Sequence, residues 1–253
     1  MSGVVAAALQ GSMPGECFTR REPLAKYLAC ADYISSSALR RFQRHGMTPE
    51  LATVSQPPPR EASLGDALHA MLLEPDRFEE NFVQAAPGTP VARLRGPEEL
   101  FERAWLSARE CEALRAMARG VRECTRPRIS GWLEHGAKEL SLYWSDAGGG
   151  RWKGRPDCFT EEVILELKTA SDIRPQRFAR ARERFGYDLQ AALYLEGVER
   201  LTGTRPRFLY VVVESVRPHA VWVQEPSPEE LARARLSLQA VRARFLAALG
   251  AGA

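Results

Sequence analysis

The sequence predicts an α/β protein with a mixed central sheet flanked by helices. Residues 138–168 abandon the helical period of the residues before them and alternate like short strands, with the turn SDAGGG at 145–150. Residues 207–215 and 219–224 have strand composition again, after two helical stretches. The order along the chain is typical of mixed sheets covered by helices. It consists of helices, a three-strand meander, helices, two strands and a last helix.

Before the meander, the pattern predicts mainly helices. The serines at 35–37 can cap a helix that runs to about His45, and residues 47–62 contain three consecutive prolines and should form a loop. Residues 63–75 form an apolar helix that Pro75 ends, followed by a short helix over 75–82 and a loop over 84–97. A long helix is expected over 98–123 from the spacing of Leu100, Phe101, Trp105, Leu106, Leu114 and Met117, and a short one over 129–136.

The meander itself consists of three predicted strands, KELSLYW, GRWKGRPDCF and EVILELK. The third, over 162–168, is mostly apolar and therefore central. Helices over 175–187 and 188–203 follow, and the capping box from Ser227 to Glu230 begins a long terminal helix.

The totals favour one soluble domain. A chain of 253 residues can bury one large core, so we expect a poorly ordered segment over 1–30 and a single domain over 31–253. No apolar run approaches the roughly 20 residues of a membrane span, which favours the cytoplasm and no membrane partner. None of the five cysteines forms a C-x-x-C pair, so neither a zinc knuckle nor an iron–sulfur cluster is expected.

The third strand carries charges where a core strand should have none. Side chains alternate along a strand, so Ile164, Glu166 and Lys168 share one face while the leucines and valine between them face the other. If residues 161–162 form a two-residue loop, Asp157 lies directly opposite Glu166 on that face. Buried charges are costly unless they are paired or hold a metal.

Two carboxylates and an ammonium group suit a hard cation. Mg²⁺ binds one or two carboxylates together with water and phosphate, so Mg²⁺ or Mn²⁺ is the expected cofactor. The alternative is a simple ion pair between Glu166 and Lys168 at a sheet edge. Only four of the 35 basic residues are lysines, so a lysine in an apolar strand suggests a role that arginine performs poorly.

Several motifs together resemble one family. RPD…ELK resembles the PD-(D/E)xK nuclease signature, and DLQAALY matches the Q-x-x-x-Y helix of its RecB-like branch, with Gln190 and Tyr194. ASLGDALHAMLLEPDRFEENF, KELSLYW and YISSSALRRF resemble parts of RecE and lambda-exonuclease-like enzymes, over about residues 33–215. Packing alone would also explain a histidine on an apolar helix and the Gln190–Tyr194 pair.

The resemblance implies a restriction-endonuclease-like fold, a chemistry and a set of residues. It implies a metal-dependent exodeoxyribonuclease that digests linear double-stranded DNA from its ends, 5′ to 3′, for a single-strand annealing recombinase, and that assembles as a ring-shaped homo-oligomer. The implied metal ligands are His69, Asp157, Glu166 and the backbone carbonyl of Leu167, with Glu139 as a possible further acid. The implied catalytic residues are Asp157, Glu166, Lys168 and Gln190.

The DNA contacts and the substrate have open alternatives. Ser35, Ser37 and Arg41 could meet a DNA phosphate or could be a helix cap and a surface charge. Arg174 and Arg177 could track a DNA backbone with Tyr194 nearby, or belong to a solvated helix face. The rival functions are a RecB-like nuclease that acts on single-stranded or flap DNA, and a non-catalytic module that binds DNA ends.

Overall fold

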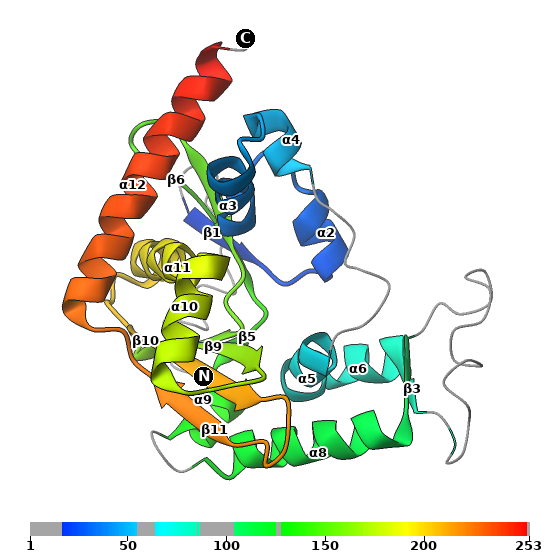
Figure 1. Ribbon diagram of the computed structural model, residues 1–253. Coiled ribbons are helices and arrows are strands. Elements are labelled where there is room, and N and C mark those ends of the chain that lie inside the picture. The colour runs from blue at the N-terminus through cyan, green and yellow to red at the C-terminus, as the bar shows by residue number, and fades with distance from the viewer. Residues whose placement is uncertain (1–16, 55–63, 85, 87–103, 125–127, 252–253) are drawn as a thin grey trace.

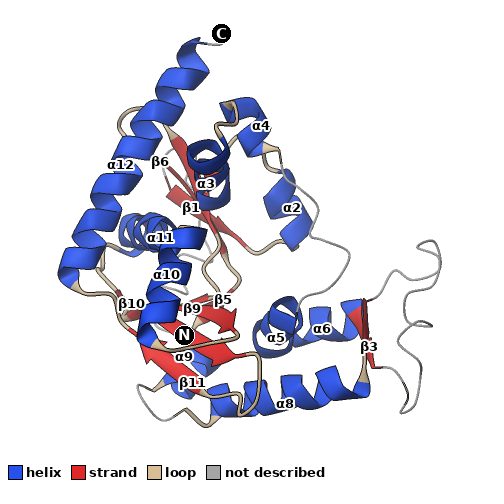
Figure 2. Cartoon of the chain, viewed as in Figure 1, coloured by secondary structure: helices blue, strands red, loops and turns tan. Residues whose placement is uncertain are grey.

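Two sheets stand on either side of a layer of helices (Figures 1 and 2). The computed structural model describes residues 17–54, 64–84, 86, 104–124 and 128–251. The first sheet has the order β1(Cys17–Arg20), β6(Ser141–Ser145), β7(Arg151–Gly154), β2(Ile34–Ser35). The second has the order β11(Val221–Gln224), β10(Arg207–Glu214), β9(Val163–Ala170), β8(Cys158–Phe159), β5(Ala137–Lys138). A small third sheet pairs β3(Phe82–Gln84) with β4(Ala104–Leu106).

The helices cover these sheets and pack against them to form two apolar cores. They are α2(Leu24–Ala29), α3(Ser36–His45), α4(Pro49–Thr53), α5(Leu64–Leu73), α6(Pro75–Asn81), α8(Ala108–Arg122), α9(Ile129–His135), α10(Pro175–Phe185), α11(Tyr187–Thr202) and α12(Pro228–Ala251). Both large sheets mix parallel and antiparallel pairs, because β9 runs parallel to β10 and β2 parallel to β7. The predicted mixed α/β architecture is therefore confirmed.

Strand β9 separates two apolar cores, as its alternating sequence predicts. Ile164 belongs to a core that includes Trp144 and Phe245, from the first sheet and α12. Leu165 and Leu167 belong to a second core, with residues of α5 and α8. The charged side chains of β9 thus lie at the end of its Ile164 face.

The predicted meander is bent into two layers. The strand expected over 138–144 breaks at Glu139, whose φ is 47°, and the next breaks over 155–157. Each half then pairs in a different sheet, β5 with β8 and β6 with β7. The breaks lie side by side, since the Glu139 N–H donates to the Asp157 carbonyl at 3.1 Å. The alternating pattern continues through the bend, which is why the sequence predicted unbroken strands.

The predicted loop after β8 is confirmed. Cys158 pairs with Leu165 and the Thr160 N–H donates to the Val163 carbonyl at 2.8 Å, so residues 161 and 162 form the turn. Continuing that register by one pair sets Asp157 beside Glu166.

Other expectations need correction. The segment expected to be poorly ordered contains β1 and α2 over its described part, 17–30. The loop expected over 47–62 includes α4, which begins at Pro49 behind its Thr48 cap. Trp105 and Leu106 lie in β4 and not in a helix, because Ser107 and Glu110 form a capping box that begins α8 at Ala108. The expected loop over 84–97, together with Leu100 and Phe101, lies almost wholly outside the described residues.

The remaining predicted helices are present. The helix after the serines at 35–37 ends at His45, and Pro75 begins α6 immediately after α5. Ser227 and Glu230 form the reciprocal hydrogen bonds of the expected capping box before α12. Within the described part of the chain, no helix has the length and apolar character needed to cross a bilayer.

Candidate metal centre and active site

The charged face of β9 holds an ion pair with one open oxygen. The Lys168 Nζ donates to Glu166 Oε1 at 2.8 Å, and Glu166 is only 2% exposed. The other carboxylate oxygen, Oε2, is buried and has no hydrogen-bond partner among the described residues. An unpartnered buried carboxylate oxygen costs free energy, so this position favours a bound cation.

Asp157 lies next to this pair and is held by the strand. Its Oδ2 accepts from the Leu167 N–H at 2.6 Å, and its Oδ1 lies 3.6 Å from His69 Nδ1. Burial and the neighbouring Glu166 carboxylate raise the pKa of Asp157 well above its usual range, against the opposing effect of Lys168. The two neighbouring carboxylates repel each other when both are ionised, and a bound cation would remove this repulsion.

His69 reaches the site from α5, which packs against β9. Its Nε2 lies 3.1 Å from the Leu167 carbonyl oxygen and can donate to it, which leaves the Nδ1 lone pair toward Asp157. Burial, together with the charge of Lys168, lowers the pKa of His69. A neutral imidazole fixed through its other nitrogen is the form that binds metals.

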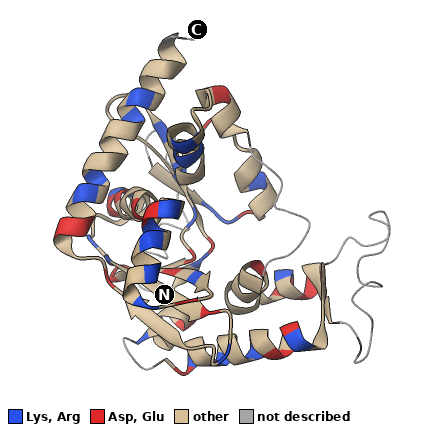
Figure 3. Ribbon diagram, viewed as in Figure 1, with Lys and Arg blue, Asp and Glu red and all other residues tan. Residues whose placement is uncertain are grey.

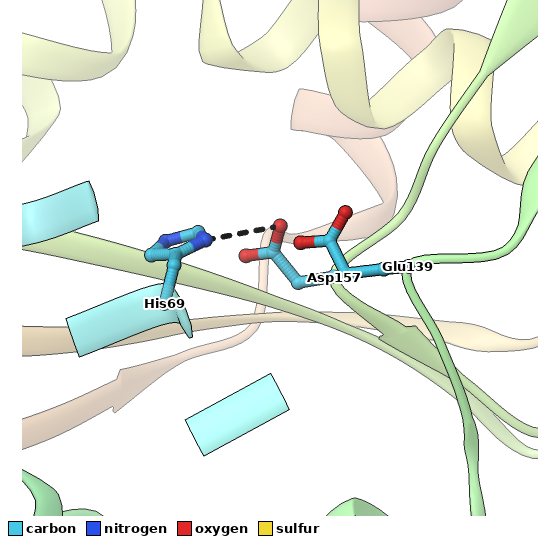
Figure 4. Close-up of side chains that lie close together, drawn as sticks. All are labelled: His69, Glu139 and Asp157. Atoms are coloured by element: carbon cyan, nitrogen blue, oxygen red, sulfur yellow. Dashed lines mark ion pairs between the residues drawn. The ribbon is translucent and has the colours of Figure 1, made fainter. Parts of the chain in front are cut away.

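Glu139 completes a group of three potential ligands. His69, Glu139 and Asp157 each offer one ligand atom, and these atoms lie within 4.8 Å of one another (Figure 4). Burial and the Asp157 charge raise the pKa of Glu139 to about 7, against the opposing charge of Arg155. The bend at Glu139 is what brings a residue of the first hairpin to the second sheet. Oxygen donors with one imidazole fit a divalent cation such as Mg²⁺ or Mn²⁺.

Lys168 is fixed on three sides. Besides Glu166, its Nζ donates to Gln190 Oε1 at 3.2 Å and lies 4.6 Å from the centre of the Tyr187 ring. The Gln190 amide in turn donates to the Tyr194 hydroxyl at 3.1 Å. Burial lowers the pKa of Lys168, but Glu166 and Asp157 more than offset this and the pKa is raised. Lys168 is therefore a charged donor in a fixed position.

The family follows from a comparison of the sequence with known domain families. A model of the PDDEXK-like domain of unknown function, DUF3799, matches residues 35–249. The chain belongs to this family. No curated protein matches the sequence.

One solved structure shares the fold of this PDDEXK-like domain. A candidate exonuclease from Eubacterium rectale superposes with a TM-score of 0.65 at 15% identity, over 92% of this chain and 88% of that chain. Its likeness confirms the mixed sheets flanked by helices that the sequence predicts. A second structure, SSO0001, aligns over 87% of this chain and 89% of that chain with 16% identity, and its TM-score of 0.32 is too low to support any argument.

A cleft of about 350 Å³ opens beside His69 and Glu139 of the PDDEXK-like domain. Its lining includes the three serines at the start of α3, Arg41, His69, Glu139 and Tyr194. The Ser35 hydroxyl accepts from the Ala38 N–H at 3.2 Å, so the capping interpretation holds for this residue. The Ser37 hydroxyl accepts from Arg40 at 2.9 Å.

Arg41 lines the cleft, and its guanidinium is fixed by a backbone carbonyl. Its guanidinium donates to the Ala52 carbonyl through Nε at 2.9 Å and NH2 at 2.6 Å. Helix α4, which the sequence did not predict, supplies this carbonyl, so Arg41 ties α3 to α4 while it borders the cleft.

Figure 3 shows basic residues along α10, and the two arginines predicted to contact DNA lie at its start. Arg174 pairs with Asp172 at 2.5 Å, and Arg177 approaches the same carboxylate at 3.6 Å. Both arginines are exposed. Neither lines the cleft.

Sequence reasoning missed two buried cations of β7 and its continuation. Arg155 donates to Glu139 Oε2 at 2.7 Å and to Glu74 Oε1 at 3.2 Å. Lys153 is 5% exposed and donates to the carbonyls of Tyr27 and Cys30. The signal was available in part, because Lys153 is one of the four lysines and Arg155 immediately precedes the proline–aspartate pair.

Proposed function

We propose that this PDDEXK-like domain is a Mg²⁺- or Mn²⁺-dependent deoxyribonuclease that hydrolyses phosphodiester bonds from the ends of linear duplex DNA. One observation carries the proposal. Asp157 and Glu166 are buried side by side, and Glu166 Oε2 lacks a partner among the described residues, while a charged lysine stands against the same carboxylate. A merely structural ion pair would leave neither the second carboxylate nor the open oxygen explained.

The residues have distinct roles in the proposed reaction. Asp157, Glu166 and His69 hold the cation, with Glu139 as a further acid and the Leu167 carbonyl at the same edge. A divalent cation, when bound there, polarises the phosphoryl oxygen and lowers the pKa of a water ligand.

Lys168 orients the attacking water and stabilises the negative charge that develops on the phosphate. Gln190 and Tyr194 keep the ammonium group in place through their chain of hydrogen bonds. Because the lysine is already positioned by three neighbours, little reorganisation is needed when the reaction occurs.

The start of α3 supplies the proposed contact for a DNA phosphate. Ser35 and Ser37 border the cleft at the first turn of a ten-residue helix, where unpaired N–H groups and the helix dipole favour an anion. Arg41 adds positive charge at the same rim. We assign Arg174 and Arg177 to a more distant, salt-sensitive contact with the DNA backbone.

The experiment is digestion of matched substrates by the purified chain with Mg²⁺, with Mn²⁺ and with a chelator. The substrates are a linear duplex, the same sequence as a covalently closed circle, and the single strand. The proposal expects metal-dependent loss of the linear duplex and survival of the circle. Preference for the single strand would support the RecB-like alternative, whereas binding of ends without cleavage would support the non-catalytic one.

Polarity and assembly belong to the same proposal. A duplex labelled at either the 5′ or the 3′ end tests the 5′ to 3′ direction, because the label of the attacked end is released first. Light scattering of the purified chain tests the ring-shaped homo-oligomer, and co-purification with a single-strand annealing protein tests the recombinase partner.

A further inference from the structure

One wall of the cleft lies outside the region that matches the family. Leu24 and Leu28 of α2 line it together with Tyr33, and all three are half-buried. Tyr27, from the same helix, also lines the cleft but is buried. The matched region begins only at residue 35, so this wall is a feature of the chain itself and not of the family model.

The wall differs in chemistry from other residues that line the cleft. Leu24 and Leu28 are four residues apart and therefore share one face of α2. The same cleft is also lined by the polar start of α3 and by His69 and Glu139, which we assign to the metal. A ligand that fits both parts of the lining has an apolar, flat part and an anionic part.

The wall is anchored to the strand that leads to Asp157. Lys153 Nζ donates to the carbonyls of Tyr27 at 2.6 Å and Cys30 at 2.7 Å, which close the C-terminal end of α2. Arg155 donates to the Glu22 carbonyl at 2.9 Å, just before the helix. Burying two cations is costly, and here they set the distance between the apolar wall and the catalytic carboxylates.

We propose that Leu24, Leu28 and Tyr33 form a subsite for the nucleobase of the terminal nucleotide, an assignment that rests on the proposed nuclease function. The base lies against the apolar wall while its phosphate faces the metal ligands and the start of α3. Nucleobases stack on aromatic and apolar side chains without regard to sequence, because every base has an apolar face. The subsite therefore selects a strand end and not a particular sequence.

The test uses substrates that differ only in the terminal base. Three linear duplexes of one sequence are compared, which are unmodified, abasic at both 5′-terminal nucleotides, or abasic at both 3′-terminal nucleotides. Initial rates of metal-dependent digestion give KM and kcat for the wild-type chain. An abasic residue at the end of the digested strand should raise KM about tenfold, and the same change at the other end should not.

The variants complete a cycle with these substrates. Leu24→Ala combined with Leu28→Ala should raise KM about tenfold on the unmodified duplex and add nothing on the duplex whose digested end is abasic. Leu51→Ala is the matched control, because Leu51 is 63% exposed on α4 and is not one of the residues that line the cleft. Melting curves check that the double variant folds, and the abasic substrates test the wild type without any variant.

Each outcome decides the matter. If the wild type digests all three duplexes with one KM, the base subsite is overturned while the nuclease function stands. An equal loss by the double variant on every substrate would show that the wall only supports the fold, which also overturns the subsite. If no DNA is digested under any condition, the proposed function itself fails.

Discussion

Two lysines lie in different sheets, Lys153 buried in β7 and Lys168 half-buried in β9, and their surroundings are opposite. Lys153 donates to backbone carbonyls of the N-terminal helix and lies 4.7 Å from the Tyr27 ring centre. Lys168 is paired with a carboxylate and contacts a second polar side chain. Burial lowers the pKa of Lys153, whereas neighbouring carboxylates raise that of Lys168 despite its burial.

This difference distinguishes a lysine that supports the fold from a lysine that can take part in a reaction. Neutral carbonyls can hold Lys153 in one place, but they leave no open ligand position and no second charge. The region of Lys168 has both, in the open Glu166 oxygen and in Asp157. A buried lysine is therefore informative about function only when its partners are known, and the rarity of lysine in this chain indicates that both positions have specific requirements.

The largest expected effect comes from removing the charge beside Lys168. Glu166→Gln keeps the shape of the side chain and should lower cleavage by about 1000-fold or more, because a metal ligand contributes several kcal/mol to the transition state. Relief of the repulsion with Asp157 and loss of the ion pair with Lys168 act in opposite directions, so the melting temperature should change little. Single-turnover digestion of linear duplex and a melting curve provide the check, and normal turnover would remove Glu166 from the catalytic site.

A smaller effect is expected for His69, the proposed ligand from α5. His69→Ala should weaken Mn²⁺ affinity about tenfold or more, and a high Mn²⁺ concentration should partly restore activity. Calorimetric titration measures the affinity, with the exposed His135→Ala as the matched control. A stable variant with wild-type metal affinity would contradict the assignment, whereas a lower melting temperature alone would indicate a core histidine.

The region of Lys153 should respond in stability. Lys153→Met removes the donor and leaves the Tyr27 and Cys30 carbonyls without it, which should lower the melting temperature by roughly 5 °C. Metal affinity should stay at the wild-type value. A variant that melts like the parent but no longer binds Mn²⁺ would reverse the distinction between the two lysines.

The smallest effect is a dependence on pH. Burial and Asp157 raise the pKa of Glu139 from 4.5 to about 7, so the metal-free fold loses stability as the pH rises through that window. A bound cation replaces the proton. The increase in melting temperature on adding Mg²⁺ should therefore be larger at about pH 8 than at about pH 6. An increase of equal size at both values would exclude Glu139 from the centre.

Much of this site could be predicted from local pattern, and the remainder depends on the bend. The alternation of β9 predicted that Glu166 and Lys168 share a face, and the spacing to Asp157 predicted the two-residue loop. The break at Glu139 could not be read, because alternating residues look the same in a straight and a bent strand. The contacts of Arg155 with Glu139 and with the N-terminal segment depend on this bend, so the sequence could not predict them either.

Two short helices were also not predicted, because their local sequences carry too little helical pattern. Helix α4 begins at a proline inside a segment that resembles a loop, and it supplies the carbonyl that turns Arg41 toward it. Helix α2 has only six residues, too few for a helical period to appear. Its position depends on Lys153 and Glu22, whose contacts span more than 100 residues of chain.

The most direct test replaces each of the two lysines by arginine in a separate variant and measures the two variants side by side. Single-turnover cleavage at saturating DNA and Mg²⁺ is recorded with a melting curve for each. Lys168→Arg should fold and bind metal yet lose about 100-fold in rate, because the wider planar group misplaces contacts with water and phosphate. Lys153→Arg should melt at a lower temperature and cleave within about threefold of the parent rate. Cleavage by Lys168→Arg within about threefold of the parent would mean that Lys168 is only a counter-ion, and the account would be contradicted.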